Sequence, residues 1–451
     1  MFPHQRFTQT LQNPEKLVLT AKEDSRTMKL MVYSHDSFGL GNIRRMVAIC
    51  KYLLETLPEV SILLVSGSPM LHSFRLPPGL DYIKLPCMGR DLSGKVAVKY
   101  LSTNVEDMIR LRSHSIAATA ANYQPDLFLI DKKPYGLCGE LKETLALLKV
   151  TLPQTKFVLL LRDILDDAET TISEWKQYGF YEAIEEFYDR VLVVGMPEIF
   201  DVVREYQFSE TIAQKVRYCG YIRREPGRLR RQPMRDKLKI APDEKLVLVT
   251  PGGGGDGYRM VESYLWGLTN LEGDRNFSSR IILGSEMPDS QKEVLFSLAE
   301  GLNNIELCEF SDDVGSEMEA ADLVVCMGGY NTVCEVLSYN KRAIVVPRIH
   351  PVREQWIRAK RMAEFGLFQT IHPHVLTPEH LMESVLAQLD KNIPHLPPVT
   401  HLDLNALPCI EREISQLLFA GFTGDTFFKS LRDREFCATP KVAAKPQEIL
   451  D

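Results

Sequence analysis

The segment of this 451-residue chain with the clearest chemical potential runs from Gly328 to Glu335. Gly328 and Gly329 end an apolar, strand-like stretch, and a helix-like pattern that carries Asn331 and Thr332 follows at once. Such a strand–turn–helix unit presents the free N–H groups and the positive dipole end of the helix to an anion. Glu335 lies one helical turn further along and can face the same ligand. The segment therefore predicts an anion-binding site.

A second polar group follows the next apolar run along the chain. That run ends at Pro347 and Arg348, and Glu354 and Gln355 come shortly after it. Open α/β sheets bind ligands at the carboxyl ends of neighbouring strands, so we expect both groups to lie at one sheet edge. Either motif alone also fits an ordinary turn with a satisfied helix cap, whereas the pair at this spacing is more specific.

A third candidate is the glycine-rich stretch that contains Gly253, Gly254 and Gly255. Glycine lets the backbone approach a phosphate and present its N–H groups. The stretch lacks the Gly-Lys-Ser/Thr ending of a Walker A loop, and it is not a G-x-G-x-x-G motif with a clear ribose-binding acid. A flexible loop without a ligand is the alternative interpretation.

These segments need a scaffold of alternating strands and helices. Short apolar runs alternate with helical patterns from residue 28 onward, which indicates a parallel sheet buried on both faces. The pattern restarts near residue 246. We therefore predict two doubly wound α/β domains. The predicted division is a flexible extension at 1–27, a first domain at 28–222, a basic linker at 223–240, a second domain at 241–420 and a tail at 421–451.

Composition fits a soluble enzyme with two domains. The chain is too long for one core, 45% of its residues are hydrophobic and 25% are charged. A net charge of -7 argues against nucleic-acid binding. The nine cysteines form no C-x-x-C pair, and no apolar run reaches the ~20 residues of a membrane span. Because a signal-peptide core is also missing, we expect a cytoplasmic protein.

The only dense basic segment lies between Arg223 and Lys239. Such a run is most often a solvated linker. The alternative interpretation is a peripheral contact with anionic lipid at the inner face of a membrane, or with an acidic acceptor.

The Gly328 and Glu354 motifs resemble the nucleotide-sugar-binding half of glycosyltransferase family 28, the MurG-like enzymes. The resemblance looks closest to a bacterial branch of predicted glycosyltransferases that share the G-G-Y-N-T and E-Q segments. It extends from Met28 to about Asp390 and is sharp only in the second half. It implies the GT-B fold, in which two Rossmann-like domains face a central cleft.

The resemblance also assigns roles on the donor side. Glu335 becomes the candidate ligand of the ribose hydroxyls, and Glu354 and Gln355 become candidate ligands of the donor sugar. The glycine-rich loop would lie in the cleft beside the donor phosphates. We find no Asp/Glu/His cluster with metal-ligand spacing and expect no cofactor. Backbone N–H groups and helix dipoles would then carry the diphosphate charge.

The acceptor side is assigned to the loop after the first strand, which includes Gly39, Gly41 and Asn42. Sugar transfer needs a base that takes the proton of the acceptor hydroxyl. Relatives usually have histidine where this chain has Asn42, and asparagine cannot remove a proton. Asp36 and His35 are the replacements we expect, with Asp36 slightly ahead. A turn-stabilising cap is the alternative role for each.

Three functions stay open on the sequence. The leading one is an inverting, metal-independent transfer of a sugar from a nucleoside-diphosphate sugar, most simply a UDP-sugar, to a hydroxyl of a glycan, lipid or small molecule. The second is a nucleotide-sugar epimerase of the same build. The third, motivated by Asn42, is a non-catalytic nucleotide-sugar-binding regulator. Fold analogy alone does not choose among them.

Overall fold

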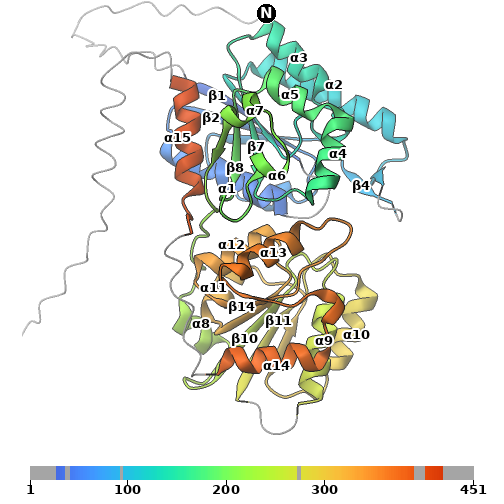
Figure 1. Ribbon diagram of the computed structural model, residues 1–451, viewed down its shortest axis with the longest axis vertical. Helices are drawn as coiled ribbons and strands as arrows, with labels where there is room; N and C mark the ends of the chain where they lie inside the picture. The colour runs from blue at the N-terminus through green and yellow to red at the C-terminus, as the bar shows by residue number, and fades with distance from the viewer. Residues whose placement is uncertain (1–26, 36–40, 92–94, 272–275, 391–401, 420–451) are drawn as a thin grey trace, which may run out of the picture.

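The computed structural model describes residues 27–35, 41–91, 95–271, 276–390 and 402–419. Apart from Thr27, the terminal segments predicted at 1–27 and 421–451 lie outside the described residues. Two α/β lobes stand one above the other in Figure 1, each built around its own sheet.

The sheet of the first domain is parallel throughout, and its strand order reverses direction between β1 and β6, as in doubly wound folds. In spatial order its strands are β3 (Leu80–Lys84), β2 (Val60–Ser66), β1 (Met28–Ser34), β6 (Leu127–Asp131), β7 (Lys156–Arg162), β8 (Arg190–Val194) and β9 (Val216–Tyr218). A small antiparallel hairpin stands apart from it, formed by β4 (Met88–Arg90) and β5 (Val96–Val98).

The second sheet repeats this plan, with its reversal between β10 and β13. Its strands are, in spatial order, β12 (Ile305–Cys308), β11 (Phe277–Ile282), β10 (Lys245–Thr250), β13 (Leu323–Cys326), β14 (Arg342–Val345) and β15 (Gln369–Thr370). The two α/β domains predicted from alternating patterns are therefore observed, and the carboxyl ends of β13 and β14 carry the two predicted donor motifs.

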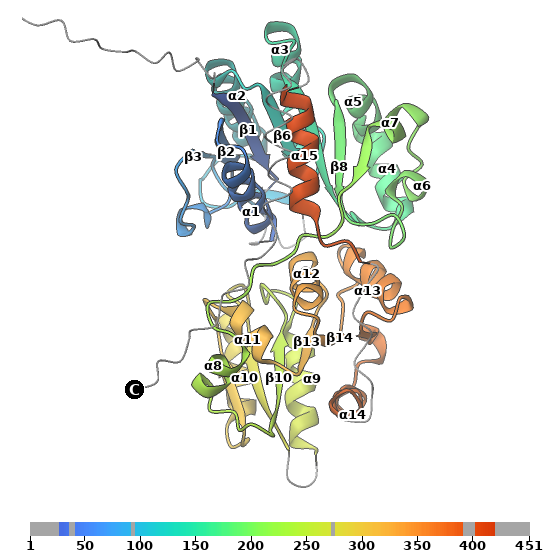
Figure 2. The ribbon, with the colours of Figure 1, turned by 90° about the vertical axis from the view of Figure 1, so that its left-hand side faces the viewer.

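Helices connect the strands and cover the sheets (Figures 1 and 2). Those between strands of the first sheet are α1 (Gly41–Thr56), α2 (Val105–Tyr123), α3 (Lys142–Thr151), α4 (Ala168–Tyr178), α5 (Phe180–Phe187), α6 (Val202–Glu205) and α7 (Glu210–Lys215). The later ones are α8 (Arg231–Lys237), α9 (Tyr258–Thr269), α10 (Asp289–Ala299), α11 (Val314–Ala320), α12 (Tyr330–Ser338), α13 (Glu354–Glu364), α14 (Pro378–Leu389) and α15 (Ala406–Phe419). Short 3-10 turns occur at Leu71–Ser73, Leu137–Gly139 and Pro373–Val375. Within the described ranges, no helix has both the length and the apolar character that a membrane crossing requires.

The apolar cores follow from the alternation of strand side chains. Along β1, Leu30 and Val32 join the core on one face of the sheet, and Met31 and Tyr33 join the core on the other. The first of these cores continues without a break into the second domain, where it includes Tyr330. Burial of one continuous apolar cluster therefore helps to hold the domains together.

The chain crosses between the domains twice, and the two crossings lie side by side. The Tyr221 N–H donates to the carbonyl of Asp403 at 2.7 Å, and Ile222 forms an antiparallel bridge with Asn405. Helix α15 then packs on α1 of the first domain (Figure 2). The sequence division placed everything up to residue 420 in the second domain, so α15 is a correction to it. Its apolar side, which includes Ile410 and Ile414, is buried in the core of the first domain.

The segment predicted as a basic linker is also more ordered than expected. Residues Arg231–Lys237 form α8, which packs on α11 of the second domain. Arg231 and Arg235 reach Asp322 at 2.7 and 3.2 Å, and Arg235 is buried. These ion pairs neutralise part of the positive charge of the basic segment within the second domain. The basic run is therefore, in part, a structural element of the second domain.

Candidate functional site

Two glycines shape the turn that precedes α12. Gly328 has a φ of +78°, and a Cβ atom there would lie 2.7 Å from Cγ1 of Val345, so both the backbone conformation and the available space favour glycine. Gly329 is the N-cap residue of α12. The N-terminus of this helix lies at the junction of the domains (Figure 1), where Nδ2 of Asn331 donates to the Gly41 carbonyl at 3.0 Å.

The glycine-rich loop lies beside the first turn of α12. A Cβ atom on Gly252 would come within 3.6 Å of Oγ1 of Thr332. Gly254 has a φ of +96°, and a Cβ atom there would lie 2.3 Å from the Leu283 carbonyl oxygen. The loop thus adopts backbone conformations that favour glycine, and it packs closely on the segment after β11. This arrangement gathers Gly253, Gly254 and Gly255 near the α12 turn.

Glu286 also lines this loop, although no sequence motif marks it. Its N–H donates to the Gly253 carbonyl at 2.8 Å, and a Cβ atom on Gly253 would lie 2.9 Å from its Oε2. Burial raises the pKa of Glu286; Lys99 of the first domain opposes this rise and Asp256 adds to it. A carboxyl group whose charged form is disfavoured repels a neighbouring phosphate less strongly.

Glu335 faces the first domain from α12. It is buried, and its Oε1 lies 3.3 Å from Nη2 of Arg44 on α1. The Arg44 side chain is 46% exposed, so it can move away from Glu335 without losing a packed environment. The carboxylate predicted to bind ribose is therefore at the domain junction and is paired with a movable cation.

The second predicted group converges on Arg348. Its backbone N–H donates to Oε1 of Gln355 at 3.2 Å. Its guanidinium reaches Asp256 of the glycine-rich loop at 2.8 Å and Glu354 at 3.3 Å. The Nε2 atom of Gln355 would lie 3.9 Å from a Cβ atom on Gly329. Arg348 thus connects the glycine-rich loop with Glu354 and Gln355, and Gln355 in turn lies beside the Gly329 turn.

Glu354 is buried and surrounded by arginines. Its Oε2 lies 2.6 Å from Nη2 of Arg162, which ends β7 of the first domain. Burial alone would raise the pKa of Glu354, but Arg162, Arg358 and Arg348 outweigh burial and hold this pKa at about 2. Glu354 is therefore an ionised acceptor of hydrogen bonds at neutral pH, and it also joins the two domains.

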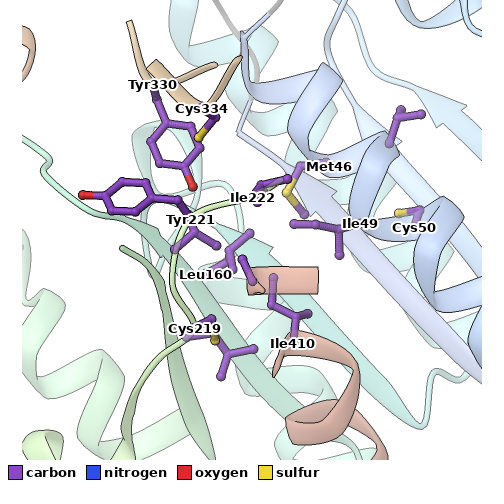
Figure 3. Close-up of a cluster of buried hydrophobic side chains, with 14 of the residues drawn as sticks. Met46, Ile49, Cys50, Leu160, Cys219, Tyr221, Ile222, Tyr330, Cys334 and Ile410 are labelled. Atoms are coloured by element: carbon purple, nitrogen blue, oxygen red, sulfur yellow. The ribbon is translucent and has the colours of Figure 1, made fainter. Parts of the chain in front are cut away.

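A second buried ion pair crosses the junction. Arg358 of α13 binds both carboxylate oxygens of Asp163, which follows β7, at 2.7 Å each, and it donates to the Gly328 carbonyl at 3.1 Å. The Tyr330 ring lies 5.7 Å from the Arg358 guanidinium and stacks on Tyr221 at a centroid distance of 6.0 Å. Figure 3 shows the two tyrosines next to each other, in one cluster with α1 and α15 side chains. This cluster fixes the turn at Gly328 relative to the first domain.

Asn42 stabilises the start of α1. Its Nδ2 donates to the His35 carbonyl at 2.6 Å, and its Oδ1 accepts from Arg45 at 3.3 Å. Arg45 is itself buried and paired with Asp131 at 2.6 Å. Both ends of the Asn42 amide are therefore engaged within the protein. Two other residues of the predicted acceptor loop, Asp36 and Gly39, lie outside the described residues.

His35 occupies the carboxyl end of the first strand. It is buried, and its Nδ1 has no hydrogen-bond partner among the described residues. Burial lowers the pKa of His35 well below its ordinary value, and the nearby charges of Lys132 and Lys133 lower it further. The imidazole is therefore neutral at physiological pH. Burial and Arg162 together lower the pKa of Lys132 to about 8.

Several residues of this site carry little signal in the sequence. Arg44 belongs to an amphipathic helix, whereas Arg162 is the last residue of the buried strand β7 and Lys132 directly follows the buried strand β6. Their position at the carboxyl ends of strands is the one available hint. Within the predicted donor set, contacts with the first domain are made by Asn331, Glu335 and Glu354. The other described members lie beside these residues or in the adjoining glycine-rich loop of the second domain: Gly253, Gly254, Gly255, Gly328, Gly329, Thr332, Arg348 and Gln355.

Comparison with known families matches the second domain. Residues 248–397 match the family model described as "Glycosyltransferase family 28 C-terminal domain". A curated relative from Haemophilus influenzae (strain PittGG) is 33% identical over 146 residues, which are 32% of this chain and 40% of the relative. It is named UDP-N-acetylglucosamine--N-acetylmuramyl-(pentapeptide) pyrophosphoryl-undecaprenol N-acetylglucosamine transferase. The match spans about two fifths of that relative's length.

Solved structures resemble most of the chain. MurG of Acinetobacter baumannii aligns with a TM-score of 0.56 and 17% identity, covering 86% of this chain and 99% of the MurG chain. The UDP-GlcNAc 2-epimerase of Methanocaldococcus jannaschii aligns with a TM-score of 0.55 and 10% identity, covering 86% and 99%. At these identities the likeness concerns the fold alone. It confirms the GT-B fold predicted from the sequence.

Proposed function

We propose that this chain, whose second domain matches the C-terminal domain of glycosyltransferase family 28, transfers a sugar from a nucleoside-diphosphate sugar to a hydroxyl acceptor. The acceptor oxygen attacks the anomeric carbon, the bond from that carbon to the phosphate oxygen breaks, and the nucleoside diphosphate leaves. Attack opposite the leaving group inverts the configuration at the anomeric carbon. The acceptor proton passes to a base of the first domain.

One observation carries this proposal. The family match covers residues 248–397, and this range holds the whole candidate donor set, from the glycine-rich loop to Gln355. The contacts of Arg348 with Asp256, Glu354 and Gln355 bring the far ends of that set together. A family resemblance in sequence and a convergence in space therefore support the same surface.

On this surface Glu335 would accept hydrogen bonds from the ribose hydroxyls, for which we propose UDP as the nucleotide. In the structure, Nη2 of Arg44 lies 3.3 Å from Oε1 of Glu335. Donor binding would displace this exposed arginine, and its guanidinium would then be free to meet the diphosphate. The exchange keeps the buried carboxylate of Glu335 satisfied before and after binding.

The sugar would be recognised by Gln355 and Glu354. The Gln355 amide can both donate and accept, and it lies beside the Gly329 turn. Glu354 stays ionised and can accept from a sugar hydroxyl while Arg162 and Arg348 hold it in position. Charge-assisted hydrogen bonds of this kind are the stronger ones.

We assign the diphosphate charge to backbone N–H groups of the glycine-rich loop and of the α12 N-terminus. Metal-independent transfer follows from this assignment. Turnover is expected to be unchanged by a chelator, and activity that requires an added divalent cation would contradict the assignment.

The base would be Asp36 or His35. His35 is neutral, and its Nδ1 has no hydrogen-bond partner in the part of the chain that the structure describes, which supports it as a proton acceptor, although its lowered pKa makes it a weak base. Asn42 cannot take the role, because both ends of its amide are engaged and an amide does not accept a proton at neutral pH.

The alternative within the same fold is an epimerase, which would rearrange the donor sugar itself. Its support is a likeness of fold, whereas transfer is supported by the sequence match of the second domain. Incubation with a panel of labelled nucleotide sugars separates the candidates. A transferase releases the free nucleoside diphosphate, either by transfer to an acceptor or by slow hydrolysis of the donor. An epimerase yields an isomerised donor, and a non-catalytic regulator only binds the donor.

We propose a hydroxyl acceptor of the glycan or lipid-linked class, because the curated relative is named for a pyrophosphoryl-undecaprenol substrate. Its place of action would then be the cytoplasm, at the inner membrane face. Exposed members of the basic segment, such as Arg223 and Lys239, remain available for such a peripheral contact. Co-sedimentation with anionic vesicles tests this, and equal recovery with neutral vesicles would count against it.

A further inference from the structure

Two cysteine thiols meet where the chain crosses between the domains. Cys219 follows β9 at the start of the first crossing and is buried in the core that contains Ile410. Cys409 lies in the first turn of α15, immediately after the return crossing. The Cys219 sulfur lies 3.7 Å from the Arg217 carbonyl oxygen, and the Cys409 sulfur lies 3.9 Å from the carbonyl oxygen of Tyr218, the residue that precedes Cys219. Figure 3 shows Cys219 and Ile410 in the same cluster.

The surroundings of the two thiols differ in ways that suit an attacking and a resolving cysteine. Cys409 is only partly buried, and Arg412, one turn along α15, places its Nη2 3.4 Å from the Cys409 sulfur. The hydrogen bond from Cys219 and the charge of Arg412 lower the pKa of Cys409 to about 7, although burial opposes this. The same hydrogen bond and burial raise the pKa of Cys219. Low-pKa, accessible cysteines next to a second thiol are the ones that oxidants convert to disulfides.

We propose that Cys219 and Cys409 form a reversible disulfide when the protein meets a peroxide. The Cys409 thiolate attacks one peroxide oxygen, which gives a sulfenic acid and, after protonation, one water. The Cys219 sulfur then attacks the Cys409 sulfur, the S–S bond forms, and a second water leaves. Two thiols are oxidised and one hydrogen peroxide is reduced to two waters. A dithiol reductant reverses the modification.

The disulfide would join the two crossings covalently. Cys219 precedes the segment that carries Tyr221, and Cys409 belongs to the helix that follows Asn405. At present this junction is held by backbone contacts such as that of Tyr221 with Asp403. A covalent link beside those contacts would restrict any movement of the two crossings relative to each other.

Peptide mapping of the full chain tests the proposal. The protein is treated with hydrogen peroxide, its remaining thiols are alkylated, and it is digested without reductant for mass spectrometry. We expect one dominant cross-linked pair that contains Cys219 and Cys409 and that disappears after dithiothreitol. Recovery of both peptides in alkylated form, or dominant pairing of either cysteine elsewhere, would overturn the proposal.

Single variants separate the two roles. In Cys219→Ser the oxidised Cys409 cannot be resolved, so dimedone should label Cys409 after peroxide treatment. Cys409→Ser should leave Cys219 alkylated after denaturation, with no cross-link. The control is Cys138→Ser, because Cys138 is exposed and lies in the Leu137–Gly139 turn, outside both crossings. Loss of the cross-link in that control would contradict the assignment.

Discussion

Arg358 of α13 binds both carboxylate oxygens of Asp163 across the domain junction, and neither side chain is more than 1% exposed. The pair positions the Gly328 turn, because Arg358 also donates to the Gly328 carbonyl. A buried charge that loses its partner is costly, so the two residues depend on each other. This pair is therefore one of the contacts that couple the donor surface to the first domain.

Replacing Arg358 should destabilise the protein strongly. Arg358→Ala leaves Asp163 buried and unpaired, and breaking such a pair typically costs about 3–5 kcal/mol. The matched control is Arg361→Ala on the same helix, whose side chain is 42% exposed and whose pairing with Glu205 is at 3.7 Å. Surface changes of this kind usually stay within about 0.5 kcal/mol. Denaturant titration followed by circular dichroism compares them, and equal midpoints would contradict the coupling.

Glu354 should make the stability of the junction depend on pH. Its pKa is about 2 in the folded protein and 4.5 ordinarily, so its stabilising contribution is present above pH 4.5 and is lost as the pH falls toward 2. Wild type should therefore exceed Glu354→Gln in Tm at neutral pH, and the two should converge in acid. Calorimetry across this range measures the difference. Glu364→Gln, at a half-exposed position of the same helix, is the matched control.

Gln355 should distinguish the sugar from the nucleotide. In Gln355→Ala the amide that lies beside the Gly329 turn is removed, and the loss of one or two hydrogen bonds should weaken UDP-sugar binding by roughly 0.5–1.5 kcal/mol per bond. UDP alone should bind as it does to wild type. Titration calorimetry with both ligands gives the comparison. Parallel losses for UDP and UDP-sugar would point to a structural role through the Arg348 backbone.

The catalytic base can be identified by comparing kcat among variants that bind the donor with the same affinity as wild type. A positioned base typically contributes ~10²–10⁴-fold in rate, so either Asp36→Asn or His35→Gln should lower kcat by about this factor. Asn42→Ala should act mainly through folding, because Asn42 holds the His35 carbonyl and Arg45. Its Tm should fall while kcat of the folded fraction changes less. Unaltered kcat in both ionisable variants would place the base elsewhere.

Much of the architecture could be predicted from local patterns. Buried strands and glycine turns are determined largely by residues close together in the sequence, so the two sheets and the turn at Gly328 could be predicted. The position of α15 could not be predicted, because the amphipathic pattern of a helix does not indicate which domain its apolar side packs against. The arginines that face Glu335 and Glu354 escape prediction for a similar reason. Arg44 and Arg162 come from the other domain, and only the folded chain brings them within 3.3 and 2.6 Å of those carboxylates.

The central claim is that the second domain binds a nucleotide sugar with Glu335 on the ribose, and titration of UDP into wild type and Glu335→Ala tests it most directly. Two charge-assisted hydrogen bonds are worth roughly 1.5–3 kcal/mol each, so the variant should lose at least tenfold in affinity. Glu383→Ala, at an exposed position of α14, serves as the matched control and should bind like wild type. Equal UDP affinity in a folded Glu335→Ala variant, or no UDP binding by wild type, would contradict the account.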